Sequence, residues 1–418
     1  MKNNQKQKFP HGFYWGAATA AHQVEGGNKN DWTKWEEQNA QRLAGKKEKI
    51  VFTIDPTKDY SDPEVKNPSN YISSIACDHY NRFAEDFDIA KKLNHNAHRF
   101  SIEWSRIEPE EGKFDEREIE HYKQVIEALK DRNIEPFATL WHFSSPVWLS
   151  EKGGWNGQRV IMYFSRYVEK IVTALSPQVK FWITINEPQI YTALCYLTGE
   201  WLAQKKNPVA HHRVFSHFVE AHLQAYKIIK KCNPQAKVGA AKNLIDFEVA
   251  GNNPWNILLK KIGRWWGDYR YLDLIKNDAD FIGFNYYFHN RINWWFNRNE
   301  NKKVSDLGWE LYPEGLYNIL MDLKKYNKPI YITESGLADA KDAKREWYIK
   351  ETLKNAQKAI SSGVDVRGHF YWSLLDNFEW NKGFWPRFGL VEVNYKTLER
   401  KIRKSALAYA EICKNNFI

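Results

Sequence analysis

Two short apolar segments, far apart in the chain, each end on a glutamate. Residues 181–188 carry Glu187, and residues 329–336 carry Glu334. Because alternate residues of a strand share one face, each glutamate is expected on the same face as apolar residues before it. A carboxylate on a buried strand costs free energy unless partners stabilise it. Two carboxyl groups at one mouth are what cleavage of a glycosidic bond requires, so the pair predicts this chemistry.

The two segments belong to a longer series of strand-like runs. Most of the runs are continuously apolar, which is typical of parallel strands covered on both faces. Helical patterns lie between most of them; residues 115–132, for example, follow the N-cap Asp115 and place Ile119 and Leu129 on one stripe. We predict strands at residues 13–20, 98–104, 135–142, 180–185, 237–245, 281–287, 329–333 and 367–373.

Strands that alternate with helices eight times predict an α/β fold, a closed (β/α)8 TIM barrel. No linker, repeat or low-complexity tract divides the 418 residues, so we expect a single domain over residues 1–418. Residues 1–8 are expected to form a flexible tail. The first crossover, residues 25–77, is rich in Pro, Asp, Ser and Asn at its centre, which predicts a long loop on the top face of the barrel.

The composition limits the classes of partner. The formal net charge is +10, but the basic residues are scattered, so we interpret them as a solvated surface and expect no nucleic-acid partner. The densest basic run, residues 400–404, is expected on a C-terminal helix. No stretch approaches the length of a membrane span, and we expect no membrane partner. The sequence leaves the oligomeric state open.

Cysteine and histidine spacing argues against metal sites and disulfides. The four cysteines have neither disulfide nor zinc spacing, and no apolar segment of the signal-peptide type follows the N-terminal lysines. We therefore expect a cytoplasmic protein. Histidines crowd residues 211–222, but steps of five residues turn by about 140° around a helix and do not share a face. We expect no metal and no cofactor.

Polar residues gather where the predicted strands end, which is where (β/α)8 barrels build their active sites. Any one of them has a structural explanation; His142 alone would more often be a buried core histidine. Their joint placement on nearly every strand end favours a site. They include Gln23, Arg99, Glu103, His142, Asn186, Glu187, Asn243, Asn285, Tyr287, Glu334 and Trp372.

Ordered motifs along the chain resemble the family 1 glycoside hydrolases, the β-glucosidase and β-galactosidase group. The resemblance runs from Phe9 to Tyr409. The motifs lie at residues 13–20 and 23–26, 99–106, 184–188, 285–287, 332–336, 371–380 and 387–390.

The resemblance implies that Glu334 is the nucleophile and Glu187 the general acid/base. Arg99 and Tyr287 would be the partners that lower the pKa of Glu334 and keep it charged. That charge would raise the pKa of Glu187 and keep it protonated. Two displacements then retain the anomeric configuration, which predicts carboxyl groups about 5–5.5 Å apart.

The resemblance also implies a sugar-binding set. Asn186 would contact the 2-hydroxyl, Trp372 would form the stacking floor, and Asn285 would be a nearby polar support. Glu379 is the residue that family members acting on 6-phosphorylated glycosides lack, and a carboxylate repels phosphate, so an unphosphorylated sugar is expected. The ligands implied for the 3-, 4- and 6-hydroxyls are Gln23, His142, Glu379 and Trp380.

Three departures from the family pattern stand out. The sugar-binding histidine of the family is usually followed by Trp-Asp-x-Pro, whereas His142 is followed by Phe143-Ser144-Ser145-Pro146. Glu334-Ser335-Gly336 replaces the usual Glu-Asn-Gly. The segment between Tyr287 and Glu334 is short for the family, which predicts an open entrance. Tryptophans that could line this entrance are Trp201, Trp255, Trp265, Trp266, Trp294, Trp295 and Trp309.

The function expected from these observations is a retaining β-glucosidase-type hydrolase of terminal β-D-glycosyl residues, with a small β-glycoside as its partner. A preference for β-galactosides or β-fucosides, or transglycosylation by the same residues, stays open. A catalytically silent sugar-binding barrel is the alternative from another class. It is disfavoured because both glutamates and their supporting residues are present.

Overall fold

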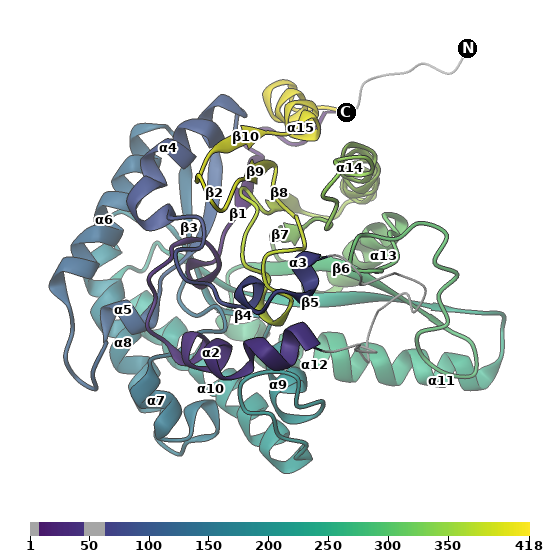
Figure 1. Ribbon diagram of the computed structural model, residues 1–418. Helices are drawn as coiled ribbons and strands as arrows, with labels where there is room; N and C mark the ends of the chain where they lie inside the picture. The colour runs from purple at the N-terminus through teal and green to yellow at the C-terminus, as the bar shows by residue number, and fades with distance from the viewer. Residues whose placement is uncertain (1–7, 46–62) are drawn as a thin grey trace.

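The computed structural model describes residues 8–45 and 63–418, and within them eight parallel strands close into a barrel in the order β1 to β8 (Figure 1). The prediction of a (β/α)8 barrel is confirmed. Every predicted strand is present, with ends shifted by up to five residues. The strands are β1 (Tyr14–Ala18), β2 (Ala97–Ser101), β3 (Glu135–Thr139), β4 (Phe181–Asn186), β5 (Lys237–Val249), β6 (Ile282–Ile292), β7 (Ile330–Ser335) and β8 (Val366–Trp372).

Helices surround the barrel, and a small antiparallel sheet of β9 (Val391–Val393) and β10 (Arg400–Ile402) follows β8 (Figure 1). The longer helices are α2 (Asp31–Gly45), α4 (His79–Lys92), α6 (Glu116–Asp131), α8 (Val160–Leu175), α9 (Pro188–Tyr196), α10 (Pro208–Cys232), α11 (Pro254–Gly263), α13 (Glu314–Leu323), α14 (Arg345–Ser361) and α15 (Lys404–Asn415). The shorter ones are α1 (Ala21–Val24), α3 (Pro63–Lys66), α5 (Trp104–Ile107), α7 (Val147–Glu151) and α12 (Arg270–Ile275). Single turns are η1 (Pro68–Tyr71), η2 (Gly154–Asn156), η4 (Lys276–Asp278), η5 (Lys324–Tyr326) and η6 (Trp380–Lys382), and η3 (Arg264–Tyr269) is a π-helix.

The predicted helix after β2 is present as α6. The Asp115 carboxylate accepts a hydrogen bond from the Arg117 N–H and caps the helix, as expected. Ile119 and Leu129 are buried against the barrel. The apolar stripe and the cap therefore both act as the sequence indicated.

Aromatic rings fill the lower part of the barrel. Phe137 and Phe181 stack with ring centroids 4.1 Å apart, and Tyr331 and Phe370 pack edge-on against Phe137. Gly239 is required here, since a Cβ at this position would come within 2.6 Å of the Phe281 ring. With its interior packed at this end, the barrel offers polar side chains at the opposite, C-terminal end of the strands.

Two expectations about loops and helices are wrong in part. The first crossover contains the 15-residue helix α2, because Trp32, Trp35 and Leu43 bury an apolar face against the barrel top. The basic run 400–404 lies mostly in strand β10, and α15 begins only at Lys404. Residues 1–7 of the predicted tail and residues 46–62 of the predicted loop lie outside the described residues.

Within residues 8–45 and 63–418, no helix combines the length and apolar character needed to cross a membrane.

Candidate active site

Glu187 and Glu334 lie at the C-terminal ends of β4 and β7, and both are buried, with 7% and 4% of their surface exposed. Glu187 precedes α9 and adopts a left-handed conformation, with φ 43°. Its N–H donates to Ala241 O of β5 at 2.7 Å, which fixes the turn. The two glutamates therefore lie at the same end of the barrel, as predicted.

The strand-parity expectation is wrong for Glu334, since Ile330 and Ile332 pack in the outer core. It holds only in part for Glu187, since Phe181 and Ile183 pack inside the barrel but Ile185 does not. Both strands carry a bulge. Between Ile183 and Asn186, β4 has one residue more than β5, and β7 has one more than β6 just before Glu334. Ile332 accordingly packs in the outer core with the helices, whereas Tyr331 packs inside the barrel. The extra residue turns Glu334 to the barrel interior, opposite Asn285 of β6.

Two donors hold the Glu334 carboxylate. Arg99 of β2 donates to Oε1 in a buried ion pair, and the Tyr287 hydroxyl of β6 donates to Oε2 at 2.7 Å. Burial raises the pKa of Glu334, and the charge of Arg99 and the hydroxyl of Tyr287 oppose that rise. The sequence expectation of a lowered pKa is wrong in net direction, although both predicted partners are confirmed as contacts. Because of Arg99 and Tyr287, Glu334 loses its proton more readily than the neighbouring carboxyl groups do.

Among residues 8–45 and 63–418, the donors to the Glu187 carboxyl group are side-chain amides. Its Oε1 accepts from Asn285 Nδ2 at 2.7 Å and from Asn243 Nδ2 at 3.2 Å. Burial, and then the charge of Glu334, raise the pKa of Glu187 to about 7, against the lowering effect of the two amides and of Lys242. A carboxyl group with this pKa exchanges protons near neutral pH, as a general acid/base must.

A hydrogen-bond chain leads from Arg99 to His142. Arg99 Nη2 donates to Asn186 Oδ1 at 2.6 Å, so the Asn186 Nδ2 is the donor toward His142 Nε2 at 3.1 Å. Burial and the charge of Arg99 lower the pKa of His142 well below its usual value, so the ring is neutral. Its proton then lies on Nδ1, which has no protein partner among the described residues and is a free donor for a hydroxyl group.

Gln23 and Glu379 lie on the opposite side of this chain. Gln23 Nε2 donates to Phe378 O at 2.8 Å, to Asn377 Oδ1 at 3.1 Å and to Glu379 Oε2 at 3.2 Å. Gln23 Oε1 is buried without a partner in the described part of the chain. Glu379 itself is partly exposed; burial, and then Glu334, raise its pKa to about 8. The pair presents one free acceptor and one neutral carboxyl group.

Aromatic rings form the wall beside these polar groups. His142 stacks between Trp372 and Trp380, at centroid distances of 5.9 Å and 6.0 Å. Trp380 also contacts Phe143 and Trp201, at 5.2 Å and 5.9 Å. Trp201 is 5% exposed, so its expected place at the entrance is wrong; it supports the wall from behind.

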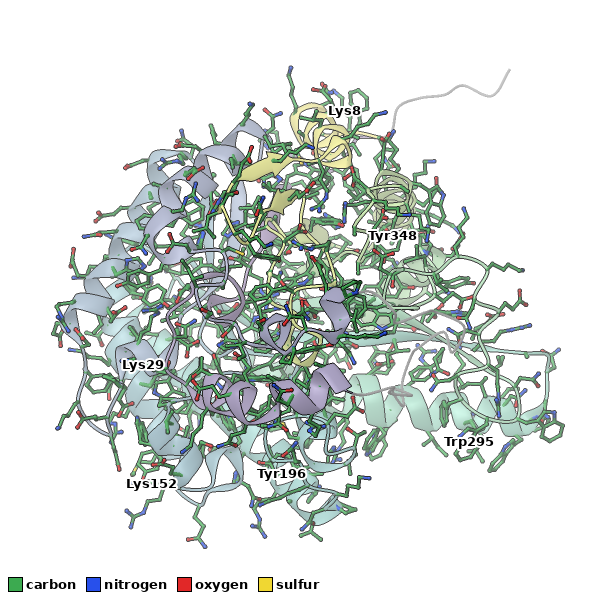
Figure 2. The ribbon with its side chains drawn as sticks, in the orientation of Figure 1. Lys8, Lys29, Lys152, Tyr196, Trp295 and Tyr348 are labelled. Atoms are coloured by element: carbon green, nitrogen blue, oxygen red, sulfur yellow. The ribbon has the colours of Figure 1, made fainter. Side chains whose placement is uncertain are left out.

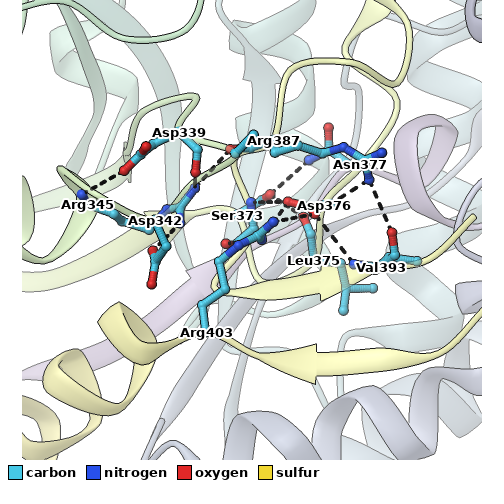
Figure 3. Close-up of polar contacts among 12 residues, drawn as sticks. Asp339, Asp342, Arg345, Ser373, Leu375, Asp376, Asn377, Arg387, Val393 and Arg403 are labelled. Carbon is cyan, nitrogen blue, oxygen red and sulfur yellow. Dashed lines mark hydrogen bonds and ion pairs between the residues drawn. The ribbon is translucent and has the colours of Figure 1, made fainter. Parts of the chain in front are cut away.

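Trp372 ends β8, and the chain after it carries Glu379 and Trp380; a buried network holds this chain in place (Figure 3). Arg403 donates to both Asp376 oxygens, at 2.8 Å and 2.9 Å, and Gly389 N donates to Oδ1 at 2.9 Å. Arg345 joins the segments by donating to Asp339 O and Arg387 O, at 2.7 Å and 2.9 Å. These bonds fix the position of the sugar-binding candidates on this segment.

The residues after His142 are integrated into the structure. The Ser144 hydroxyl donates to Glu103 Oε2 at 2.7 Å, and Ser145 N donates to Asp31 Oδ1 at 2.8 Å. Phe143 lies between Trp201 and Trp380 and offers no polar group. Glu103, a polar strand-end residue, thus has a structural role: it caps α5 through Ser105.

Two features near Glu187 were not assigned a role from the sequence. Asn243 contacts Glu187, and its position on a predicted strand end was the available signal. Lys242 is buried beside Asp268; burial lowers the pKa of Lys242 to about 8 and raises that of Asp268 to about 7. A lysine inside an apolar strand could have indicated this pair.

The histidines of residues 211–222 have separate partners. His222 is buried between Thr184 and Asp278 O, and the His217 ring contacts Trp155 O at 2.7 Å. His211 stacks on Trp266. They therefore do not converge on one point.

Comparisons with known proteins agree with this geometry. The model of glycosyl hydrolase family 1 matches residues 5–258 and 268–418. A β-glucosidase A of Thermotoga maritima is 34% identical, with 98% of each chain covered, and a β-galactosidase of Pyrococcus woesei is 28% identical, covering 98% of this chain and 97% of its own. A solved β-glycosidase from Pyrococcus horikoshii has a TM-score of 0.87 and 35% identity, with 99% of this chain and 96% of its own covered.

Proposed function

We propose, on the premise that the chain belongs to glycosyl hydrolase family 1, that Glu334 is the nucleophile and Glu187 the general acid/base of its glycosidase reaction. The chain is a retaining β-glycosidase of the β-glucosidase type. One observation carries the assignment of roles. Glu334 has a guanidinium and a phenol as partners, whereas the hydrogen-bond donors to Glu187 in the described part of the chain are the amides of Asn285 and Asn243.

In the first displacement, a Glu334 oxygen forms a bond to the anomeric carbon as the bond to the aglycone oxygen breaks. Glu187 gives its proton to the leaving oxygen. The product is a glycosyl ester of Glu334 and a free alcohol. In the second displacement, Glu187 takes a proton from water as that water attacks the anomeric carbon, and Glu334 leaves as a carboxylate. Two inversions retain the configuration, for which carboxyl groups about 5–5.5 Å apart are expected.

The charge of Glu334 couples the two steps. While Glu334 is ionised, burial and then the charge of Glu334 raise the pKa of Glu187 to about 7 and favour the protonated acid. Formation of the ester removes that charge, and the pKa of Glu187 falls, so the same group becomes a base toward water. In the ester, Arg99 and Tyr287 contact a neutral group instead of a charged carboxylate. They contact a charged carboxylate again when Glu334 is released.

The remaining polar groups suit the binding of a sugar at the same end of the barrel. Asn186, held by Arg99, is proposed to contact the 2-hydroxyl, where stabilisation of the transition state is greatest. His142 Nδ1–H and Gln23 Oε1 supply a donor and an acceptor for further hydroxyl groups, and Trp372 supplies a flat face. Asn285 positions Glu187, and Trp380 supports His142 by stacking.

We propose an unphosphorylated glucoside as the substrate. A phosphate beside Glu379 would face the charge of Glu334, which acts on Glu379 electrostatically. The side chains of Gln23 and Trp372, which hydrogen bond to Glu379, are neutral and would not pair with a phosphate. A β-galactoside or β-fucoside preference, or transfer to an alcohol, would use the same residues, and the Pyrococcus woesei relative is a β-galactosidase.

We further propose that the chain works as one domain in the cytoplasm. All four cysteines are free, and Cys77, Cys195 and Cys413 are buried as thiols. Reduced cysteines suit a reducing compartment.

The reaction of the enzyme with a 2-deoxy-2-fluoroglucoside carrying a good leaving group tests the proposal. The fluorine slows both steps, and the leaving group restores the first, so the ester accumulates. Peptide mass spectrometry is expected to find the sugar on the peptide that contains Glu334. A label on another residue, or no label with retained turnover, contradicts the assignment. Hydrolysis rates for a panel of nitrophenyl glycosides that differ at the 4- and 6-positions separate the sugar preferences.

A further inference from the structure

Exposed apolar side chains gather on one projecting part of the molecule. Of the thirteen large apolar side chains exposed among the described residues, nine lie between residues 255 and 295. Leu274 lies apart from the others on α12, and we call the remaining eight the tryptophan patch. Its members are Trp255, Ile257, Leu258, Ile262, Trp265, Trp266, Trp294 and Trp295. Large exposed apolar patches mark surfaces that bind something.

The patch lies on α11, on η3 and on the chain after β6, at the lower right edge of the molecule (Figure 1). Figure 2 shows Trp295 at the outer end of this projection. The two chain segments are joined, since Trp255 Nε1 donates to Trp294 O at 3.1 Å and Trp294 N donates to Asn256 Oδ1 at 2.7 Å. The exposed rings are therefore held by a folded support.

The helix has three distinct faces. Asn256, Leu259 and Gly263, spaced three and four residues apart, face inward; a Cβ on Gly263 would come within 3.0 Å of the Phe247 ring. Trp255, Leu258, Ile262 and Trp265 repeat at the same spacing on a neighbouring stripe that is exposed. Because the inward face already makes the core contact, the exposed apolar stripe is not needed for packing.

The third face is cationic. Residues 254–267 include Lys260, Lys261 and Arg264 and no acidic residue. Arg264 pairs with Asp322, whereas Lys260 and Lys261 form no ion pair within the described residues. On a helix with about 100° per residue, Lys261 lies about 80° from the centre of the tryptophan stripe and is its nearest cation, whereas Lys260 lies about 180° from it.

The family model does not match residues 259–267, which hold both lysines and two tryptophans of the patch. This part of the surface is therefore a feature of this chain more than of the family. An exposed stripe of Trp, Leu and Ile beside a row of Lys and Arg is the composition of helices that lie in the interface of a membrane. Trp is the side chain that prefers the headgroup level.

We propose that the tryptophan patch docks the enzyme onto an anionic lipid surface, with α11 parallel to the membrane and its aromatic rings at the headgroup level. Lys261, the cation nearest to the stripe, faces the lipid phosphates, and Lys260 and Arg264 add to the positive charge of the helix. This inference replaces the sequence expectation of no membrane partner. It does not depend on the roles of Glu187 and Glu334.

Vesicle flotation of the full-length protein tests the proposal. Binding is expected to vesicles of phosphatidylglycerol and phosphatidylcholine in equal parts, to weaken in high salt, and to be weaker on phosphatidylcholine alone. The triple variant W265S/W294S/W295S and the variant K260E/K261E are each expected to bind at least about 10-fold more weakly.

Matched control variants carry the same changes elsewhere on the surface. M162S/V209S/L407S removes three exposed apolar side chains, and K91E/K92E reverses two exposed lysines in the last turn of α4. Both controls are expected to float like the wild type. All variants are expected to hydrolyse a soluble aryl glycoside normally, which shows that they are folded.

Three outcomes would overturn the proposal. They are a wild type that does not float with anionic vesicles, a tryptophan variant that floats as well as the wild type, and equal losses in the control variants. A wild-type dimer that the tryptophan variant converts to a monomer, without vesicle binding, would assign the patch to a second copy of the chain.

Discussion

Tyr287 donates a hydrogen bond of 2.7 Å to Glu334 Oε2, from a phenol whose pKa burial and the nearby carboxylates raise well above its usual value. The phenol therefore stays protonated and is a permanent donor. Since Arg99 already neutralises the other oxygen, this single contact can be removed without leaving a cation unpaired.

Tyr287→Phe is expected to lower kcat/KM by about 10- to 100-fold, the value of about one hydrogen bond to a charged group. Tyr287 lowers the pKa of Glu334, so its removal raises that pKa. The reaction needs ionised Glu334, and the acid limb of the kcat/KM profile should move to higher pH. If the acid limb does not move, Tyr287 does not control the pKa of the nucleophile Glu334.

Glu334→Ala is expected to abolish turnover, because it removes the carboxylate that forms the bond to the anomeric carbon. Added azide should restore reaction of an aryl glucoside with a good leaving group and give a glycosyl azide of inverted configuration, detectable by NMR. Near-normal hydrolysis without azide would disprove the nucleophile assignment.

Glu187→Gln removes the transferable proton and keeps a similar shape. We expect a large loss of rate for alkyl glucosides, by about 10²- to 10⁴-fold, and a small loss for dinitrophenyl glucosides, whose leaving groups need little protonation. A plot of rate against leaving-group pKa measures this. Equal losses across the series would contradict the acid role.

The basic limb of the pH profile of kcat/KM should reflect the pKa of Glu187. Its pKa is about 7, and the first displacement needs the protonated form, so kcat/KM should fall as pH rises through about 7. Asn243 lowers that pKa by hydrogen bonding, so Asn243→Leu is expected to move the basic limb to higher pH. Asn318→Leu, at an amide that contacts Asp246 instead, is a control that should leave the limb unchanged.

Lys242 and Asp268 form a buried pair of opposite charge behind Glu187. Lys242→Met leaves Asp268 without its compensating charge and is expected to cost about 3 kcal/mol of unfolding free energy. Lys242→Met with Asp268→Asn should recover most of that loss. Urea unfolding of the two variants measures the difference; equal destabilisation would show that the charges do not interact.

The sequence predicted the barrel and the two glutamates, but partly for the wrong reason. The alternation of residues before Glu334 would have turned it toward the helices. A bulge turns it inward, and bulges leave no signal in the apolar pattern because they depend on the neighbouring strand. The motifs identified Glu334 correctly because they match the family residue by residue and need no assumption about the face.

Other features could not be predicted because they depend on contacts between distant segments. Trp201 has the same residue type as the exposed Trp265, and only the fold shows that one is buried behind Trp380 and the other faces water. The net rise in the pKa of Glu334 depends on how much water the closed barrel excludes, which no motif encodes. Helix α2 lies in a segment whose Pro and Asp content indicated a loop.

The contact between Arg403 and Asp376 has a consequence for synthesis of the protein. Asp376 fixes the segment with Trp372, Glu379 and Trp380, and its bidentate partner Arg403 lies 27 residues further along the chain. Chains emerge from the ribosome with the N-terminus first. A nascent chain that has already exposed both glutamates still lacks the anchor of its sugar-binding wall, so activity should arise only after Arg403 has also left the ribosome.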